Sequence, residues 1–339
     1  MAVSTIDPNG LNVGQFGNRN MVINGGMNIS QRATSVTGIG TTSGYFTCDR
    51  WKYSEALNTA GELTMTQTSD GPNGVSANCL KLDCTTADTS IAAGEFIRIQ
   101  QIFEGQDLQR IGKGKVGAKE LTVSFYVKAN AAITFACELY DANNGRQISK
   151  LFSCTTDWTR VVLTFPADVD DGSSPFNDDN ARSLDLSFII HAGSGFTSGT
   201  LNSSSWANLV QANRAPGIGS FFSSTSNEFY LTGVQMEVGP VATEFEHRAY
   251  GDELQRCQRY YYQNTSDSFY AFQYVTSHKF VQWPHPVYMR ATPSDIVTYL
   301  GGSFTAYHTD NKHFKAYASS SYTDTVAHRV ESYKLDAEL

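Results

Sequence analysis

Apolar and polar residues alternate along most of the chain between residues 21 and 247. The stretch LTVSFYV at 121–127 puts an apolar side chain at every second position, and residues 62–69 alternate in the same way. Residues 228–238 also alternate, with a change of phase at Gly233. A period of two residues is typical of a half-buried β-strand. About ten such stretches are separated by turn signals rather than by helical patterns. The pattern predicts an all-β fold, an antiparallel β-sandwich of the jelly-roll type.

One of these stretches departs from strict alternation. In residues 95–103, Phe96 is out of step with Ile97 and Ile99. We therefore expect a β-bulge there, or a strand with apolar side chains on both faces.

The patterns divide the chain into four parts. Residues 1–20 are rich in glycine and asparagine without any period, and we interpret them as an N-terminal arm. Residues 21–247 form the predicted sandwich. Residues 248–263 have apolar positions at helical spacing and predict a linker helix. Residues 264–339 hold short aromatic stretches broken by prolines, which predicts a smaller C-terminal β domain.

Two long connections interrupt the predicted sandwich. Residues 167–183 are acidic, and residues 193–227 are rich in serine and glycine and contain Trp206. Connections of this length usually make contacts or carry function.

The stretch MVINGGMNI interrupts an apolar sequence with Asn24, Gly25 and Gly26. Glycine permits a positive φ or the close approach of another segment. We hypothesise a kink that turns the arm into the first strand, with nearby polar side chains hydrogen-bonded around it and a tryptophan packed beneath. The alternative is a hairpin turn closed by a surface salt bridge. The residues assigned to this motif are Asn24, Gly25, Gly26, Gln31, Arg32, Asp49, Arg50 and Trp51.

Composition supports a folded β-protein and narrows its partners. Of the 339 residues 40% are apolar, 17% charged and 12% aromatic. The apolar fraction is large enough to form a core, and the charged fraction is too small for a disordered chain. The net charge of −8 argues against nucleic acid and anionic membranes as partners. We find no stretch long enough for membrane insertion and no secretory signal pattern at the N-terminus.

The six cysteines are scattered and form no CxxC pair, so we expect free thiols in a protein made in a reducing cytoplasm. A disulfide between Cys79 and Cys84 is the alternative.

Motifs that carry catalysis or bind cofactors are missing from the sequence. There is no HExxH, GxSxG, P-loop or GxGxxG pattern, and the seven histidines have no metal-ligand spacing. We expect no enzymatic activity and no cofactor. A weak Ca²⁺ candidate is the acidic connection with Asp168, Asp170 and Asp171, whose simpler interpretation is a solvated acidic surface.

Aromatic residues offer the more relevant chemistry, because the C–H faces of sugars stack on aromatic rings. Trp51 and Trp158 stand at the starts of strands and are expected in the core. Tyr270, Phe272 and Tyr274 alternate, so they would share one face of a strand. An alternative is that these rings pack the small domain or a trimer interface. The candidate glycan contacts are Trp206, Tyr270, Phe272, Tyr274, Trp283, Tyr307 and Tyr317.

Seven stretches, in this order, carry a family resemblance: NRNMVINGGMNISQRATS, YFTCDRW, LTVSFYVKA, WTRVVLTFPA, FYLTGVQMEVGPVATEFEHRAYGDELQRCQRYYYQ, PVYMRATP and LDAEL. From Asn18 onward the chain resembles a family of bacteriophage virion appendage proteins. These are tail-fibre or receptor-binding-like proteins, common in phages of cyanobacteria and other aquatic bacteria. The stretches SFYVKA and WTRVVLTF also resemble strands of carbohydrate-binding modules.

The resemblance implies a structural component of a virion, made in the host cytoplasm. We expect a tail fibre or receptor-binding appendage that attaches to the bacterial host surface, through a glycan or a protein. It would be a homotrimer, as phage fibres commonly are, and would join other virion proteins through its N-terminal arm. The first alternative is a capsid or tail decoration or connector protein without host binding. The second is a glycan-degrading tail enzyme.

Overall fold

The structure is a computed structural model of the 339-residue chain. It describes residues 17–57, 59–169, 175–265, 269–270, 272–275, 278–300, 305–306, 310–319 and 329–339. Within these ranges, the strand residues among 269–281, 283, 295–300, 305–306, 316–319 and 329–331 are described by their backbone.

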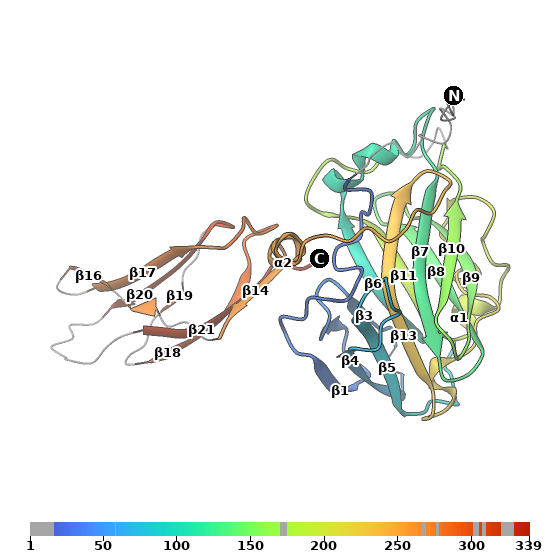
Figure 1. Cartoon of the computed structure of the whole chain (residues 1–339), viewed down its shortest axis with the longest axis horizontal. Coiled ribbons are helices and arrows are strands. Elements are labelled where there is room, and N and C mark those ends of the chain that lie inside the picture. The colour runs from blue at the N-terminus through green and yellow to red at the C-terminus, as the bar shows by residue number, and fades with distance from the viewer. Residues whose placement is uncertain are drawn as a thin grey trace, which may run out of the picture.

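Two antiparallel sheets face each other in the larger part of the molecule (Figure 1). The six-stranded sheet has the order β1 (Ser35–Ile39), β4 (Glu62–Thr68), β5 (Cys79–Thr86), β13 (Glu228–Val238), β7 (Leu121–Ala129) and β10 (Thr159–Phe165). The seven-stranded sheet has the order β12 (Ala207–Asn208), β9 (Arg146–Cys154), β8 (Ile133–Asp141), β11 (Arg182–Ala192), β6 (Phe96–Glu104), β3 (Lys52–Ser54) and β2 (Gly44–Tyr45). The predicted antiparallel jelly-roll sandwich is confirmed.

The core lies between these sheets and follows from the alternation. In β7 the side chains at 121, 123, 125 and 127 are buried and belong to one cluster, which also contains Trp51. The ring of Phe125 meets Phe188 of β11 at 4.9 Å and Phe152 of β9 at 5.0 Å, both edge to face. Such ring pairs stabilise a core beyond the area they bury. The inward faces of the strands therefore close into one apolar layer.

The departure from alternation at Phe96 has the expected result. Ile97 and Ile99 of β6 lie in the main core, whereas Phe96 packs on the other face of the sheet in a second cluster with Ile189 and Ala192. The register between β6 and β11 also shifts at this point. The strand therefore carries apolar side chains on both faces.

The long connection at 193–227 covers part of the sandwich with short helical turns. They are α1 (Ser194–Thr197), η2 (Gln211–Asn213) and η3 (Phe221–Ser223), and a further turn, η1 (Gly105–Ile111), follows β6. Phe221 and Phe222 enter the main core. This connection is therefore a packed cover and not an open loop.

The linking helix is shorter than the predicted 248–263. Helix α2 spans Tyr250–Gln258, and residues 261–264 form a strand, β14 (Tyr261–Asn264). β14 pairs with β21 (Arg329–Asp336) of the C-terminal unit, so its hydrogen bonds come from a sheet partner. The aromatic residues Tyr260 to Tyr262 favour this extended conformation over a further helical turn.

The C-terminal unit extends from α2 away from the sandwich (Figure 1). One of its sheets contains β14, β21, β15 (Phe269–Tyr270) and β18 (Ser294–Leu300). The other contains β16 (Phe272–Val275), β17 (His278–Pro284), β20 (His313–Ser319) and β19 (Thr305–Ala306).

The six cysteine thiols are free and buried, as the scattered sequence positions predict. Burial raises the pKa of the Cys79 thiol to about 11, which keeps it protonated and unreactive at neutral pH. Over the described ranges, no helix has the length and apolarity needed to cross a membrane.

The stretch around Asn24 forms a kink held by its own side chain. Asn24 has a φ of 56°. Its Nδ2 donates to the carbonyls of Ile29 and Asp49 at 2.8 and 2.9 Å, and its Oδ1 accepts from the Ile29 amide at 3.0 Å. Trp51 packs beneath and donates from Nε1 to the Asn24 carbonyl at 3.1 Å. The amide side chain thus replaces the backbone hydrogen bonds that the kink breaks.

Gly25 is required because another strand passes too close for a side chain. The Val234 amide of β13 donates to the Gly25 carbonyl at 2.9 Å. A Cβ at Gly25 would lie 2.1 Å from the Val234 carbonyl oxygen. Asn20, the last residue of the predicted arm, is buried beside it and donates to the same oxygen at 3.1 Å.

We predict that Gly25→Ala lowers the free energy of unfolding by about 2 kcal/mol, because the new methyl group forces the kink away from β13. The matched control is Gly251→Ala in α2, where a Cβ meets nothing within 4 Å. Alanine there should be neutral or stabilise by up to about 1 kcal/mol. Urea unfolding of both variants measures the difference, and equal effects would contradict this account of Gly25.

Candidate functional site

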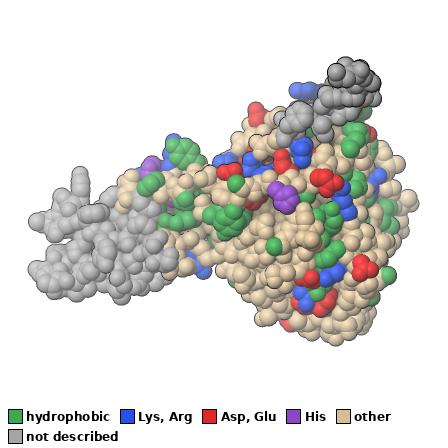
Figure 2. All heavy atoms as spheres, in the orientation of Figure 1, with side chains coloured by type: hydrophobic (Ala, Val, Ile, Leu, Met, Phe, Trp, Pro, Cys, Tyr) green, Lys and Arg blue, Asp and Glu red, His purple; other side chains and the backbone are tan. Residues whose placement is uncertain are grey.

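A cavity of about 90 Å³ lies where the kink meets the segment that enters α2. We call it the junction cleft and define it by its lining residues 20, 24–26, 28, 245–248, 250 and 253. Its lining comes from two chain segments more than 200 residues apart in sequence, which meet because the segment of residues 21–25 runs beside β13. Figure 2 shows acidic, basic and apolar side chains interspersed along the junction between the sandwich and the C-terminal unit.

The charged groups at the floor of the cleft form hydrogen bonds and ion pairs with other groups of the protein. The Glu246 carboxylate accepts from the amides of Arg19 and Asn20 at 3.1 and 3.0 Å. Burial opposes ionisation of Glu246, yet these amides hold its pKa below the usual range. Arg248 pairs with Glu253 at 3.2 Å and donates to the carbonyl of Val22 at 2.9 Å. The floor is therefore rigid and leaves little hydrogen-bonding capacity for a ligand.

Groups at the rim of the cleft are free. Tyr250 is 65% exposed, and the ring of Phe245 meets His247 edge to face at 5.3 Å. Asn28 uses its Oδ1 to accept from Asn78 at 3.0 Å. Among the described residues, none hydrogen-bonds to Asn28 Nδ2, the His247 ring nitrogens or the Tyr250 hydroxyl. The rim thus offers aromatic faces and unused polar groups above a fixed floor.

A group of buried and partly buried charges connects the sandwich to the C-terminal unit. We call Arg32, Arg50, Glu104, Arg259, Tyr260 and Glu338 the joint. The Arg50 guanidinium pairs with Glu338, donates to the Ile102 carbonyl at 2.6 Å and stacks 3.4 Å from the centre of the Tyr260 ring. Arg50 is only 1% exposed. Burial opposes its charge, but the Glu338 carboxylate raises the pKa of Arg50 further above its usual value.

The second half of the joint anchors the end of α2. Glu104, at the end of β6, accepts from Arg259 Nε at 2.9 Å and Nη2 at 2.7 Å and from the Tyr260 hydroxyl at 2.5 Å. Arg32 pairs with Glu338 at 3.4 Å and lies 3.6 Å from the centre of the Tyr261 ring. Each charge in the joint has a partner from the other unit, so the two units are held face to face by directional contacts.

The structure divides the residues of the sequence motif into two groups. Asn24, Gly25 and Trp51 form the kink itself, whereas Arg32 and Arg50 form ion pairs with Glu338. Asp49 stays beside Gln31 and accepts from its backbone amide at 2.9 Å. Burial raises the pKa of Asp49 to about 6, although hydrogen bonds from Gln31 favour the ionised form. The motif thus serves the joint as well as the kink.

Trp206 does not stand on a surface for glycans. Its side chain belongs to the main core, the residue is 8% exposed, and Nε1 donates to the Pro166 carbonyl at 2.8 Å. Its position in a polar connection suggested exposure, but a large ring with one satisfied N–H fits a buried edge of a sandwich well.

The aromatic alternation at Tyr270, Phe272 and Tyr274 does not lie on one strand. Tyr270 is in β15, which pairs with β21, whereas Phe272 and Tyr274 are in β16, which pairs with β17 of the other sheet. Alternation over five residues cannot reveal a change of sheet between the first ring and the second.

Of the remaining aromatic candidates, two lie in described strands. Trp283 is in β17 opposite Phe314, and Tyr317 is in β20 opposite Phe280. Tyr307 lies outside the described residues.

Of the three residues of the weak Ca²⁺ candidate, the structure describes Asp168. Asp168 is buried and accepts from Arg146 Nε and Nη2 at 2.8 Å each, with Lys113 at 3.5 Å. Two cations therefore already balance this carboxylate. Asp170 and Asp171 lie outside the described residues.

The sequence led us to expect Trp158 in the core, but the structure places it outside the core. It is half-buried against Tyr230 at 6.2 Å, and its Nε1 donates to the Asp70 carbonyl at 3.0 Å. The ammonium of Lys128 lies 5.4 Å from its ring and 4.4 Å from that of Tyr230. These rings are covered by lysine side chains and are less open than Tyr250.

Sequence reasoning missed the rim residues Phe245, His247 and Tyr250. The available signal was two aromatic residues and a histidine clustered in the short segment EFEHRAY before the helix. Nothing in that segment shows that residues 20–28 lie opposite, so the cleft could not be derived from sequence alone.

Comparison with known proteins adds no family. No protein-family model matches the chain, and no curated protein sequence does. Among solved structures, it is similar to the carbohydrate-binding module TmCBM61 in complex with β-1,4-galactotriose, with 8% identity, a TM-score of 0.33, and coverage of 65% of this chain and 99% of the module. A family 11 carbohydrate-binding module of a Clostridium thermocellum cellulase has 13% identity, a TM-score of 0.29 and coverage of 62% and 96%.

A xylan-binding CBM22 domain from Paenibacillus barcinonensis has 11% identity, a TM-score of 0.29 and coverage of 60% and 97%. Structural similarities with TM-scores this low support no conclusion about function. The fold assignment rests on the strand pairing of the chain itself.

We predict that Glu338→Gln lowers the free energy of unfolding by about 3 kcal/mol, because it leaves the buried Arg50 charge without its counter-ion. The C-terminal unit should then be cleaved faster in limited proteolysis. Glu244→Gln is the matched control, since Glu244 pairs with Arg160 at 3.7 Å but is 91% exposed at its side chain. That change should stay within about 0.5 kcal/mol. If the two variants behave alike, the joint does not hold the units together.

Asp49 should make the protein lose stability as the pH rises. Its pKa of about 6 in the folded chain exceeds the value of about 3.9 in an unfolded one. The folded state therefore holds the extra proton between these values, and the resulting stabilisation is lost as pH rises through 6. Between pH 4.5 and 7 the contribution amounts to about 2 kcal/mol.

Asp49→Asn removes this titration. Relative to wild type, we expect the variant to gain about 2 kcal/mol between pH 4.5 and 7 in chemical unfolding experiments. Parallel stability curves for the two proteins across that range would contradict the assignment.

Proposed function

We propose that this chain is a structural, non-catalytic attachment component of a bacteriophage virion. It would be a tail fibre or receptor-binding appendage that binds a saccharide of the bacterial surface in the junction cleft. The observation that carries the ligand class is the combination, in one cavity, of the exposed Tyr250 ring with unused polar groups at the rim.

Saccharides suit this rim for two physical reasons. Their C–H faces stack on an aromatic ring such as Tyr250, and their hydroxyls both donate and accept hydrogen bonds. Asn28 Nδ2 offers donors, while the His247 nitrogens and the Tyr250 hydroxyl offer both roles. The fixed floor means that binding need not order the protein, which lowers the entropic cost of association.

A neutral saccharide fits the cleft better than an acidic one. The charged residues in its lining are Arg248, Glu246 and Glu253, so the carboxylates outnumber the guanidinium. An additional carboxylate or sulfate on the ligand would face a negative surplus in a partly dry site.

The virion assignment rests on the sequence resemblance from Asn18 onward. Under this proposal the arm joins other virion proteins and three chains assemble. The last two residues of the predicted arm already pack on the sandwich side: the amides of Arg19 and Asn20 donate to Glu246, and Asn20 is buried. A truncation test of the arm should therefore stop before Arg19, because Arg19 and Asn20 hold Glu246.

The alternative of a connector within the virion is favoured by the joint. A set of buried ion pairs holds the sandwich and the C-terminal unit in one orientation, which suits a rigid spacer. A connector would bind other virion proteins and would have no need of an open aromatic rim.

The test is binding of the purified full chain to immobilised neutral and acidic bacterial polysaccharides. We expect saturable binding to a neutral polysaccharide, without release of reducing ends. Tyr250→Ala should weaken it at least about tenfold through lost stacking, and Tyr250→Phe should weaken it less.

The matched control is Tyr288→Ala. Tyr288 is also 65% exposed but lies outside the cleft, with the ammonium of Lys312 5.0 Å from its ring. Its loss should leave affinity unchanged. No binding to any polysaccharide, together with binding to virion proteins, would support the connector. Equal losses in both variants would mean that the cleft is not the site.

A further inference from the structure

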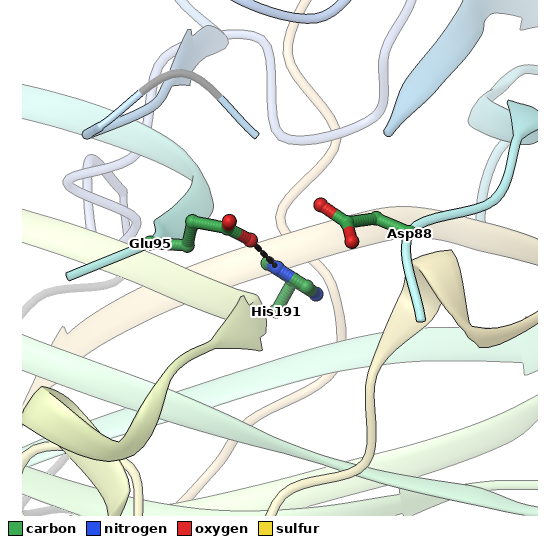
Figure 3. A group of neighbouring side chains, drawn as sticks. All are labelled: Asp88, Glu95 and His191. Carbon is green, nitrogen blue, oxygen red and sulfur yellow. Dashed lines mark hydrogen bonds and ion pairs between the residues drawn. The ribbon is translucent and has the colours of Figure 1, made fainter. Parts of the chain in front are cut away.

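Three buried side chains from distant parts of the sandwich converge (Figure 3), and none of them lines the junction cleft. Asp88 follows β5, Glu95 precedes β6, and His191 lies near the end of β11. One ligand atom from each lies within 4.8 Å of the others, and all three residues are buried. Figure 3 shows the Asp88 carboxylate facing the Glu95–His191 pair.

The positions of these side chains are fixed by their surroundings. Asp88 Oδ2 accepts from the Thr59 hydroxyl at 2.9 Å and the Ala60 amide at 3.0 Å. Glu95 Oε1 accepts from the Ala92 amide at 3.0 Å. His191 Nδ1 lies 2.7 Å from the Ser220 hydroxyl, which turns Nε2 toward Glu95 Oε2 at 2.9 Å. The imidazole is thus oriented with one nitrogen toward the two acids.

Charge balance distinguishes this cluster from most other buried acids. The exception is Asp49, a single carboxylate that accepts hydrogen bonds from Gln31. Within the described ranges, the following buried carboxylates pair with an arginine or lysine: Glu104, Glu138, Asp141, Asp168, Asp185 and Glu237. No described lysine or arginine forms a salt bridge with Asp88 or Glu95. A protonated His191 would offset only one of the two negative charges. A divalent cation bound with neutral imidazole would offset both.

We propose that Asp88, Glu95 and His191 bind one divalent first-row transition-metal ion, with Zn²⁺ as the first choice. Its ligands would be one carboxylate oxygen from each acid and Nε2 of the imidazole. Imidazole and carboxylate together suit such an ion, whereas Ca²⁺ and Mg²⁺ prefer oxygen alone.

The existing geometry fits this ion with small adjustments. Bonds of about 2.1 Å place neighbouring ligand atoms about 3.0–3.4 Å apart in common coordination geometries. The 2.9 Å between His191 Nε2 and Glu95 Oε2 is close to that spacing. The Asp88 carboxylate oxygen lies within 4.8 Å of both other ligand atoms and would move toward the ion to complete the set. Water would take a fourth position. The contact from His191 Nδ1 to Ser220 is the kind of hydrogen bond that orients a ligating histidine.

The role of the ion would be structural. Asp88 also donates its amide to the Phe222 carbonyl at 2.8 Å, and the Gly193 amide donates to the Glu95 carbonyl at 2.8 Å. The cluster therefore fastens the β5–β6 connection to the end of β11 and to the cover at 219–222. An ion there would stabilise one end of the sandwich and leave the junction cleft unaffected.

The test uses the full chain without an affinity tag, stripped with a chelator and titrated with Zn²⁺, Mn²⁺, Ca²⁺ and Mg²⁺. We expect one Zn²⁺ per chain by elemental analysis. At a hundredfold excess over the dissociation constant, the melting temperature should rise by about 5 °C or more. Ca²⁺ and Mg²⁺ should produce a smaller shift at equal concentration.

Variants assign the effect to the cluster. Glu95→Gln and Asp88→Asn keep the side-chain size and should lose both the bound Zn²⁺ and the shift. Glu138→Gln is the matched control, a buried carboxylate paired with Arg214 at 2.6 Å, and it should keep the shift whatever its own stability. If the ligand variants do not fold, Co²⁺ bound to wild type gives a visible absorption that Zn²⁺ should displace at one equivalent.

Two results would overturn the proposal. One is wild-type protein with no stoichiometric metal and an unchanged melting temperature, which leaves His191 as a hydrogen-bond partner of Glu95 only. The other is a Zn²⁺ shift that persists in Glu95→Gln and Asp88→Asn, which places the ion elsewhere.

Discussion

The buried ion pair between Arg50 and Glu338 is the contact on which the arrangement of this molecule depends. A guanidinium that is almost fully buried must keep its counter-ion, because an unpaired charge there costs several kcal/mol. Its counter-ion, Glu338, comes from the last residues of the chain, and its face is covered by the Tyr260 ring. The sandwich cannot bury Arg50 properly unless that unit is docked. The pair therefore sets the position of α2, and with it one wall of the junction cleft.

The cleft shows how a rigid frame leaves a few groups free for binding. Its floor is closed by hydrogen bonds to residues 20–24: Glu246 and Glu253 accept from backbone amides, and Arg248 donates to a backbone carbonyl. Its rim keeps an aromatic ring and polar groups in solvent. A frame of this kind presents a preformed surface without needing catalytic machinery, which is what attachment to a saccharide requires. The Asp88–Glu95–His191 cluster is a second rigid polar group, and it fastens the β5–β6 connection to the end of β11.

The parts that could be predicted from sequence are those that depend on local periodicity. Alternation in residues 121–129 identified a strand with its inward face, and the misplaced Phe96 identified the two-sided strand. Asn24 and the glycines indicated a kink, because their backbone preferences are local. Long-range partners could not be inferred in this way. Arg50 and Glu338 are 288 positions apart, and no local pattern links them. Trp206 and the stretch from Tyr270 to Tyr274 were misjudged because burial and change of sheet are properties of the assembled fold.

Hydrogen exchange of the intact protein, followed residue by residue, tests the role of the joint most directly. The informative amides are those of Ala337, which donates to the Tyr260 carbonyl at 2.8 Å, and Arg290, which donates to the Arg259 carbonyl at 2.7 Å. If the joint holds the two units together, both should exchange as slowly as amides in β7 and β13, through global unfolding. Exchange within minutes at Ala337 and Arg290, while the sandwich strands stay protected, would show that the segments carrying Tyr260 and Glu338 open independently of the sandwich, and would contradict the account.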